Sequence, residues 1–543
     1  MKISSTLFLT TAAVCCMMIA GCDGNKSQIP EFDYEALNEQ ALEEYLQPVH
    51  PGVRGETPFW NKFSTKYIYA PVFDFDDVEN AKGYTFTAEA GGKFFVFDSD
   101  NPRTPLSEIW TEIPVGPVKL SVQAYDGQGV LLGEPQSCSF EKDNPFCGPY
   151  DPAPISYTES AIKAAESLHK SVVGQGWIPG PDPSMEYRHN CYACKIWSGT
   201  IQTECFLARM KAEYKDEALD IARRAADFMM EIAQPAGAPL AYFPPTYYHS
   251  PKGGGIAKVL EFNNGKTMFL EATYAANALL DLYDLTKEQK YFDHAVGIAR
   301  TYQKLQAEDG SWPVKVIYET AEPVNDARCL PADILMVANR LKVKYGVDGF
   351  EEMVEKGEKW MWDNTISGFK FDGQFEDVPI EDKVPYQNLT HCTAGDCVEY
   401  LMTKPEQSES DLAACWEISR WAEDQFTRWH SEIEYDANAL SAVDSVFTSP
   451  FVFEQYAWKN PVDASIAKVA NNFINLYKKT GDKLCLAKAK ALADTLVKIQ
   501  DPETGTMPTV PNSDTKFSPD DIWANCVYYS IGTLMRMAEI FEN

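Results

Sequence analysis

Residues 215–233 read KDEALDIARRAADFMMEIA, and this pattern decides the fold class. Apolar side chains recur along one stripe at helical spacing, at Leu219, Ala222, Ala226 and Met229. The charged side chains point elsewhere, so the stretch predicts a helix with one face on a core and the other in water. Residues 268–285 and 522–541 are instead apolar nearly all round, which is typical of helices packed on every side.

These two kinds of helix alternate from about residue 155 onward, in units that repeat. Short polar turns precede the outer helices, at 215–217, 287–289, 347–349, 409–411 and 481–483. Longer insertions begin with a glycine, at Gly176, Gly237, Gly310, Gly368 and Gly505. The wide last interval predicts one more, degenerate copy near 430–438. Six units of two helices predict a closed ring, with the long loops and the N-termini of the inner helices on one face.

The first 22 residues predict export and lipid anchoring. A positive start at Lys2 and an apolar run over 7–19 precede Ala20-Gly21-Cys22. The last three residues resemble a bacterial lipobox, which implies cleavage before Cys22 and a lipid on its sulfur. We therefore expect residues 1–22 to be a signal peptide and the mature chain to be held at the cell envelope through this lipid. The outer membrane is favoured, and the face of that membrane is left open.

The chain after Cys22 predicts two folded parts. Residues 23–58 predict a polar tether with a short helix near 33–45. Strand patterns follow at 67–69, 84–87, 94–97 and 118–125, and they predict a small antiparallel β-sandwich over 59–148. Residues 60–142 resemble a fibronectin type III or immunoglobulin-like module. Residues 149–543 are expected to form the helical domain.

Charge and cysteine content narrow the partners. A formal net charge of -31 weighs against nucleic acid, because phosphate binding needs clustered Lys and Arg. Among the 14 cysteines, Cys138 and Cys147 could pair, and the close pairs Cys191–Cys194 and Cys392–Cys397 are interpreted as buried thiols or local disulfides rather than zinc ligands. No cofactor is expected, with Ca²⁺ among the loop acids left open.

The hairpin rhythm, and Asp309-Gly310-Ser311-Trp312-Pro313 in particular, resembles the six-hairpin glycosidase-like superfamily. The resemblance covers residues 155–543 as an architecture. It implies a multidomain protein in which a small antiparallel β-sandwich precedes an all-α (α/α)₆ toroid. Members of this superfamily include glycoside hydrolases, polysaccharide lyases and uronate epimerases, so the expected substrate is a polysaccharide or oligosaccharide.

A sugar-binding cleft needs aromatic faces with amides, imidazoles and charges between them. The long loops supply this mixture, and the candidate substrate-binding residues are Trp177, Tyr187, Arg188, Asn190, Tyr247, His249, Trp312, Asn388, Trp458 and Trp523. Arg188 carries the most information, because a carboxylate-binding arginine suits an acidic sugar better than a neutral one.

Two reactions compete for the same loop face. Hydrolysis needs two carboxyl groups, and the candidates near the inner rim are Asp326, Asp333, Asp396, Glu204 and Glu271. Elimination or epimerisation of a uronate needs a group that neutralises the sugar carboxylate and a Tyr or His that takes the proton, for which His189 and His391 are candidates. We favour a glycoside hydrolase with Asp333, Asp326, Glu271, His189 and His391 as catalytic candidates. A uronate lyase or C5-epimerase, and a non-catalytic surface glycan-binding lipoprotein, are the alternatives.

Overall fold

The computed structural model describes residues 29–174, 192–248, 257–376, 385–430, 450–510 and 522–542. Helix α1 (Tyr34–Tyr45) begins at the predicted place, because the side chain of Asp33 accepts a hydrogen bond from the amide of Ala36. The sheet that follows has the order β1-β5-β4-β2-β3. Its strands are β1 (Lys66–Tyr67), β2 (Gly83–Ala90), β3 (Lys93–Ser99), β4 (Gly116–Tyr125) and β5 (Leu131–Lys142).

The expected sandwich is met only in part. Strands β2 to β5 pair antiparallel and β1 runs parallel to β5, and the described residues of 59–148 form this one sheet without a second sheet facing it. The inner face is covered by irregular chain and by the short helix α2 (Ser107–Trp110). Trp110, Tyr67 and Phe73 all contact the ring of Phe140 on β5. Large aromatic side chains therefore fill the space where a second sheet would lie, and the resemblance to a fibronectin-like module stays a prediction.

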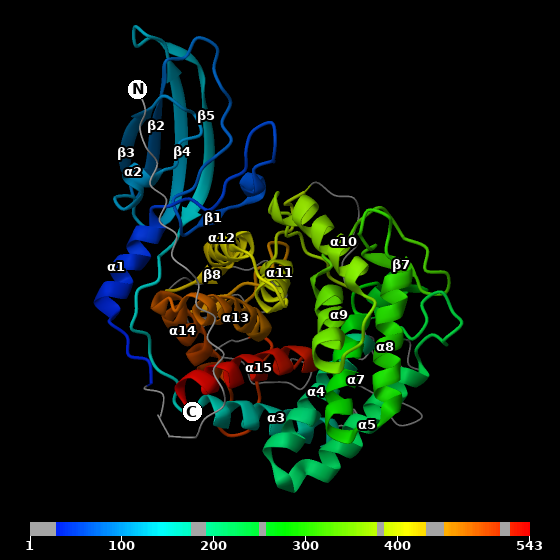
Figure 1. The fold of residues 1–543 in the computed structure, drawn as a ribbon. Coiled ribbons are helices and arrows are strands. Elements are labelled where there is room, and N and C mark those ends of the chain that lie inside the picture. Colours follow the sequence, from blue (N-terminus) through cyan, green and yellow to red (C-terminus); the bar gives the residue numbers. More distant parts are fainter. Residues whose placement is uncertain are drawn as a thin grey trace, which may run out of the picture.

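Twelve long helices of the described chain alternate between an inner and an outer position, which is consistent with an (α/α)₆ toroid (Figure 1). The inner helices contact one another in chain order, and the last contacts the first, so they close a ring. They are α4 (Ala193–Met210), α7 (Ala272–Thr286), α9 (Ala332–Tyr345), α11 (His391–Thr403), α13 (Asp463–Thr480) and α15 (Ala524–Phe541). The outer helices are α3 (Tyr157–Gly174), α5 (Lys215–Glu231), α8 (Gln289–Lys304), α10 (Glu351–Met361), α12 (Glu409–Phe426) and α14 (Lys483–Ile499).

The shorter elements lie in the connections between these helices. They are η1 (Trp60–Phe63), η2 (Ala212–Tyr214), α6 (Ala257–Phe262), the π-helical turn η3 (Trp362–Ile366), and the strand pairs β6 (Lys266–Met268) with β7 (Lys315–Ile317) and β8 (Thr427–Arg428) with β9 (Phe451–Val452). None of the helices within the described ranges combines the length and the apolar character needed to cross a membrane. The cysteines in those ranges, Cys138 and Cys147 included, are free thiols.

Two of the repeat glycines occupy positions that require glycine, for the same physical reason. Gly310 and Gly505 have φ angles of 92° and 75°, in the left-handed region that favours glycine. A Cβ at Gly310 would collide with the carbonyl oxygen of Lys356 on α10, and one at Gly505 would lie 2.7 Å from the carbonyl oxygen of Lys163 on α3. These two loops thus return tightly against the next outer helix of the ring, whereas Gly237 and Gly368 show neither feature.

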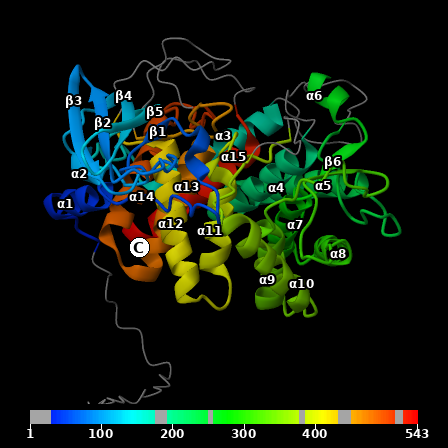
Figure 2. The same cartoon turned by 90° about the horizontal axis from the view of Figure 1, so that it is seen from above.

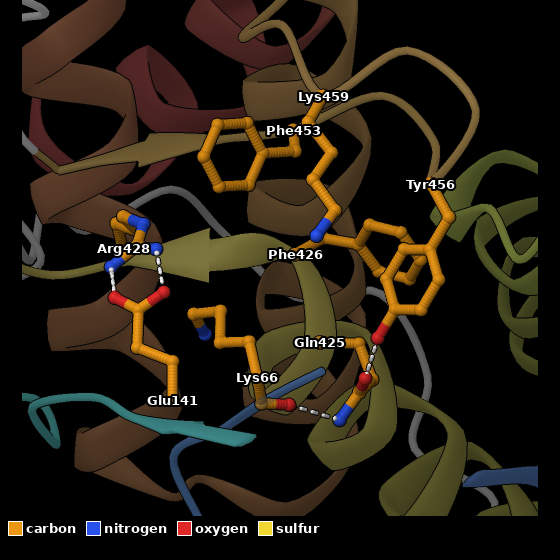
Figure 3. A pocket seen from close by; sticks show the side chains of 8 residues that line it. All are labelled: Lys66, Glu141, Gln425, Phe426, Arg428, Phe453, Tyr456 and Lys459. Atoms are coloured by element: carbon orange, nitrogen blue, oxygen red, sulfur yellow. Dashed lines mark hydrogen bonds and ion pairs between the residues drawn. The ribbon is translucent and has the colours of Figure 1, made fainter. Parts of the chain in front are cut away.

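Buried charges attach the sheet to the ring, beside α12 and α14 (Figures 1 and 2). Arg428 forms two hydrogen bonds to the carboxylate of Glu141, at 2.9 and 3.0 Å, and Lys66 donates to the carbonyl oxygen of Asp424 at 2.7 Å. Figure 3 shows the small cavity of about 40 Å³ between them, in which Gln425 bridges the backbone of Lys66 and the hydroxyl of Tyr456. These contacts fix the two parts of the chain against each other.

Candidate functional site

The N-terminal ends of the inner helices bring carboxyl groups to the ring centre. Glu271 immediately precedes α7, Asp333 lies in the first turn of α9, and Asp463 is the first residue of α13. All three are buried. Asp396 and Lys468 lie about one turn deeper, on α11 and α13.

Asp396 and Lys468 form an ion pair across two inner helices. The Nζ atom of Lys468 lies 2.8 Å from Oδ1 of Asp396 and 5.0 Å from the ring centroid of Tyr529 on α15. Burial alone would lower the pKa of Lys468, but Asp396 and Tyr529 raise it well above its ordinary value. Lys468 therefore keeps its charge and stays paired with Asp396.

Asp333 faces this pair from α9. Burial, followed by the charge of Asp396, raises the pKa of Asp333 to about 8, although Lys468 and Lys195 oppose the shift. Its Oδ2 atom has no hydrogen-bond partner within the described part of the chain. Oδ1 of Asp463 and Nδ1 of His391 are unpaired in the same way, so the ends of the inner helices hold several buried polar atoms that a water or a ligand can satisfy. The carboxyl group of Asp333 is protonated at neutral pH, and one of its oxygens is free to form a hydrogen bond with a ligand.

Glu271 belongs to a second charged group, on the α4 side. Lys195 of α4 lies 3.5 Å from Glu271 and 2.5 Å from Glu376. Burial raises the pKa of Glu271 to about 7, and Lys195 counteracts this shift. Its Oε2 atom also lacks a hydrogen-bond partner among the described residues. Lys195 lowers the pKa of both Glu271 and Asp333, so the two charged groups lie close enough to interact.

Aromatic and amide side chains lie in the loops that lead into the inner helices. Trp458 and Trp523 are stacked with their ring centroids 6.5 Å apart, and both remain half-buried. Asn388 donates to Gln455 at 2.8 Å and accepts from the amide of Ala457, which fixes the loop that carries Trp458. The predicted site residues Glu271, Asp333, Asn388, Trp458 and Trp523 therefore all lie at the N-terminal ends of inner helices or in the loops leading to them.

No family model and no curated protein matches this sequence. Among solved structures, a family 76 glycoside hydrolase from a bovine Bacteroides thetaiotaomicron strain is 12% identical, with a TM-score of 0.46 over 86% of this chain and 96% of that chain. A cellobiose 2-epimerase from Spirochaeta thermophila is 11% identical, with a TM-score of 0.43 over 73% of this chain and 88% of that chain. An unsaturated glucuronyl hydrolase specific for heparin is 9% identical, with a TM-score of 0.45 over 71% and 98%. No residue role carries over at these identities, so the site rests on the contacts given above.

Three candidates do not take the expected place. Trp312 is fully buried and donates its indole N–H to the carbonyl oxygen of Tyr302, so it is a core residue and not a sugar platform. Asp326 lies exposed in the loop between β7 and α9, and is not among the buried acids. Glu204 is buried against His169 of the outer helix α3, at 2.8 Å. In each case the residue type suited a sugar site, but packing, which the sequence pattern does not give, placed it elsewhere.

His391 and Tyr247 reach the inner side of the ring but are poorly placed to act on a proton. His391 is fully buried, and burial and Lys468 lower its pKa to about 3, so its imidazole is neutral. Tyr247 is buried and donates its hydroxyl to the carbonyl oxygen of Glu376 at 2.6 Å. Both side chains are therefore interpreted as packing residues of the ring.

Several predicted residues lie outside the described residues. They are Trp177, Tyr187, Arg188, His189, Asn190, His249 and the lipidation candidate Cys22, together with the degenerate repeat copy at 431–438. Conversely, Lys195, Lys468 and Tyr529 were not among the predicted site residues. The sequence does carry a signal for Lys468, which is the one charged residue in Ser465–Ala470, among small and apolar residues. A lysine in such a helix must face a charge or solvent.

Proposed function

We propose that this protein is a carbohydrate-active enzyme that hydrolyses glycosidic bonds at the centre of the helical ring. The observation that carries the proposal is the meeting of two unlike carboxyl groups. Asp333 is buried with an unpaired oxygen, while Asp396 is bound by Lys468. Glycoside hydrolysis needs such a pair, one protonated and one ionised, on either side of the bond to be cleaved.

The roles follow from these environments. Asp333 donates its proton to the oxygen that leaves the anomeric carbon, because burial keeps the proton in place at neutral pH. Asp396 serves as the carboxylate that activates water or attacks the anomeric carbon. Trp458 and Trp523 offer apolar faces on which a sugar ring stacks.

A uronate lyase or epimerase is the second candidate, and one observation favours it. Lys468 lies against Tyr529, so a cation and a phenol stand side by side at the ring centre. A cation can neutralise the carboxylate of a uronic sugar while a tyrosine exchanges the proton at C5. We rank this below hydrolysis, because burial raises the pKa of Tyr529, so its hydroxyl stays protonated at neutral pH and does not accept the C5 proton.

Product chemistry separates these functions, with an epimerase recognised by solvent deuterium incorporated at C5 of polygalacturonate without new reducing ends or ultraviolet absorbance. The full chain is incubated with mannan, xylan, dextran and polygalacturonate, and new reducing ends are measured beside the ultraviolet absorbance of an unsaturated uronate. Hydrolysis gives reducing ends without this absorbance, and a lyase gives both. Binding by calorimetry without turnover would show a glycan-binding protein instead, and the hydrolase proposal would then be wrong. The variant Asp333→Asn is expected to lose activity in the same assay. Its control is Asp227→Asn, which breaks an exposed ion pair between outer helices.

We also propose that the chain is a lipoprotein of the bacterial cell envelope, anchored through Cys22. This rests on the lipobox-like residues alone. Labelling of the expressed protein with a radioactive fatty acid, compared with Cys22→Ser, tests it. Label that survives in Cys22→Ser would refute the assignment.

A further inference from the structure

Three cationic side chains line the cavity between the sheet and the ring. They are Lys66 of β1, Arg428 of β8 and Lys459 of the loop between β9 and α13. Among the described residues, Glu141 of β5 is the one acid that lines the same cavity. Figure 3 shows Lys66 and Lys459 entering the cavity from opposite sides. Cations from three separate segments of the chain therefore meet in a space of about 40 Å³.

Two carboxylates bind Arg428 and Lys66. Arg428 forms two hydrogen bonds to Glu141, at 2.9 and 3.0 Å. Asp143 is buried and lies 3.3 Å from Nζ of Lys66 and 3.2 Å from the guanidinium group of Arg428. Both carboxylates are thus already paired with cations other than Lys459.

Lys459 has no acidic partner of its own. Its Nζ atom donates to the hydroxyl of Thr65 at 3.0 Å and lies 5.2 Å from the ring centroid of Tyr456, but it forms no ion pair with the described residues. Asp424 is a further acid at this interface, and its carboxylate oxygens accept from two backbone amides and from the side chain of Gln425. The half-buried ammonium group of Lys459 therefore faces the cavity without a carboxylate partner.

The electrostatics of the cavity disfavour its own lysines. Burial lowers the pKa of Lys459, and although Glu141 opposes this shift, the charges of Arg428 and Lys66 add to it. Burial also lowers the pKa of Lys66, against the effect of Asp143. A negative charge placed among these side chains would counteract both shifts and stabilise the charged lysines.

We propose that this cavity binds a small monovalent anion of the size of chloride. A volume of about 40 Å³ is enough for a water molecule or a monatomic ion. Lys459 donates to the anion, and so does Lys66, which uses its other N–H groups on the carbonyl oxygen of Asp424 and on Asp143. The site is separate from the proposed hydrolysis at the ring centre.

The bound anion joins the two parts of the chain. Lys66 belongs to the N-terminal sheet, whereas Lys459 belongs to the loop that leads into the inner helix α13. An anion held by both is a further polar contact between the sheet and the ring, beside the pair of Arg428 and Glu141. The fold should therefore be more stable when the anion is present.

Thermal unfolding of the full chain tests the proposal. Sodium chloride replaces sodium gluconate at constant ionic strength, because gluconate is too large for the cavity, and the melting temperature is followed by circular dichroism. We expect a saturating rise of about 2 °C with chloride, and no such rise in Lys459→Gln. Lys478→Gln is the matched control, because it removes an exposed lysine of α13 and should keep the rise. No rise in the wild type, or an equal rise in Lys459→Gln, would overturn the proposal.

Bromide gives a second test that does not depend on the folding of a variant. Crystals of the wild-type chain are soaked in sodium bromide, and diffraction is measured at the bromine absorption edge. We expect an anomalous peak in the cavity between Lys66 and Lys459. Peaks confined to the outer surface would show an adventitious ion only, and the proposal would then be wrong.

Discussion

Asp333 is the residue on which the proposed chemistry depends most. Its carboxyl is protonated below about pH 8 and is expected to act as the general acid. Asp333→Asn keeps the shape of the side chain but cannot donate the proton, so we expect activity to fall at least about 100-fold. The wild-type rate should also decline as the pH rises through about 8, the pKa of this group. A pH–rate profile checks both, and an Asp333→Asn enzyme with the wild-type rate would remove Asp333 from the mechanism.

The same carboxyl group makes the stability of the fold depend on pH, in a direction that follows from its raised pKa. Its pKa is raised from 3.8 to about 8 in the fold, so the folded chain binds this proton more tightly than the unfolded chain. Its contribution to stability is therefore full in acid and is lost as the pH rises towards about 8. Asp333→Asn should melt at a higher temperature than the wild type at about pH 9 and at a similar temperature at about pH 4, as followed by circular dichroism. A lower melting temperature at high pH would contradict the burial of an unpaired carboxyl.

Among the elements, α12 and α14 hold the sheet to the ring through a buried ion pair. Lys488 of α14 lies 2.8 Å from Glu423 of α12 and 3.0 Å from Glu44 of α1. The hydroxyl of Tyr69 also donates to Glu423, at 2.7 Å. The N-terminal part and two outer helices thus share one charge cluster.

Removing one partner of this cluster leaves a buried charge behind. Lys488→Met is expected to cost about 3–5 kcal/mol in the free energy of unfolding, because Glu423 then has no cation. Lys478→Met breaks an exposed pair with Glu539 and should cost less than about 1 kcal/mol. Urea denaturation measures both changes. Equal costs for the two variants would show that the cluster does not hold the sheet.

At this scale the helices and strands β1 to β4 were largely predictable, whereas strand β5 was not. Outer helices begin at Lys215, Gln289, Glu409 and Lys483, within two residues of the predicted turns, because polar turns and capping side chains such as Asp482 are local signals. Strand β5 was not singled out, since its Gln136-Ser137-Cys138-Ser139 run lacks the β-branched residues that mark strands. It pairs with β4 as a hairpin closed at Asp126–Val130, and its parallel pairing with the distant β1 is one that a local pattern does not reveal.

For the whole molecule, the ring could be predicted but not the contents of its centre. The alternation of outer and inner helices predicts closure, and closure brings the ends of six inner helices together. Which side chains then face one another depends on the rotation of each helix. That rotation placed Lys468 beside Asp396 and buried Trp312, and it is set by packing between segments far apart in the sequence.

The sheet and the ring should unfold together. Three buried or partly buried contacts join the two parts: Arg428 with Glu141, Lys66 with the carbonyl oxygen of Asp424, and Lys488 with Glu44. Exposing one part would therefore leave polar groups without partners in the other. We expect a single calorimetric transition, with the melting curves from near- and far-ultraviolet circular dichroism superimposed. Two separate transitions would indicate an independent N-terminal module.

A structure of Asp333→Asn with an oligosaccharide of the hydrolysed polymer tests the central claim most directly. We predict a sugar at the ring centre, with the bridging oxygen within about 3 Å of the side chain of residue 333 and Asp396 facing the anomeric carbon. A sugar bound only on the sheet or on the outside of the ring, with the centre empty of it, would contradict the account.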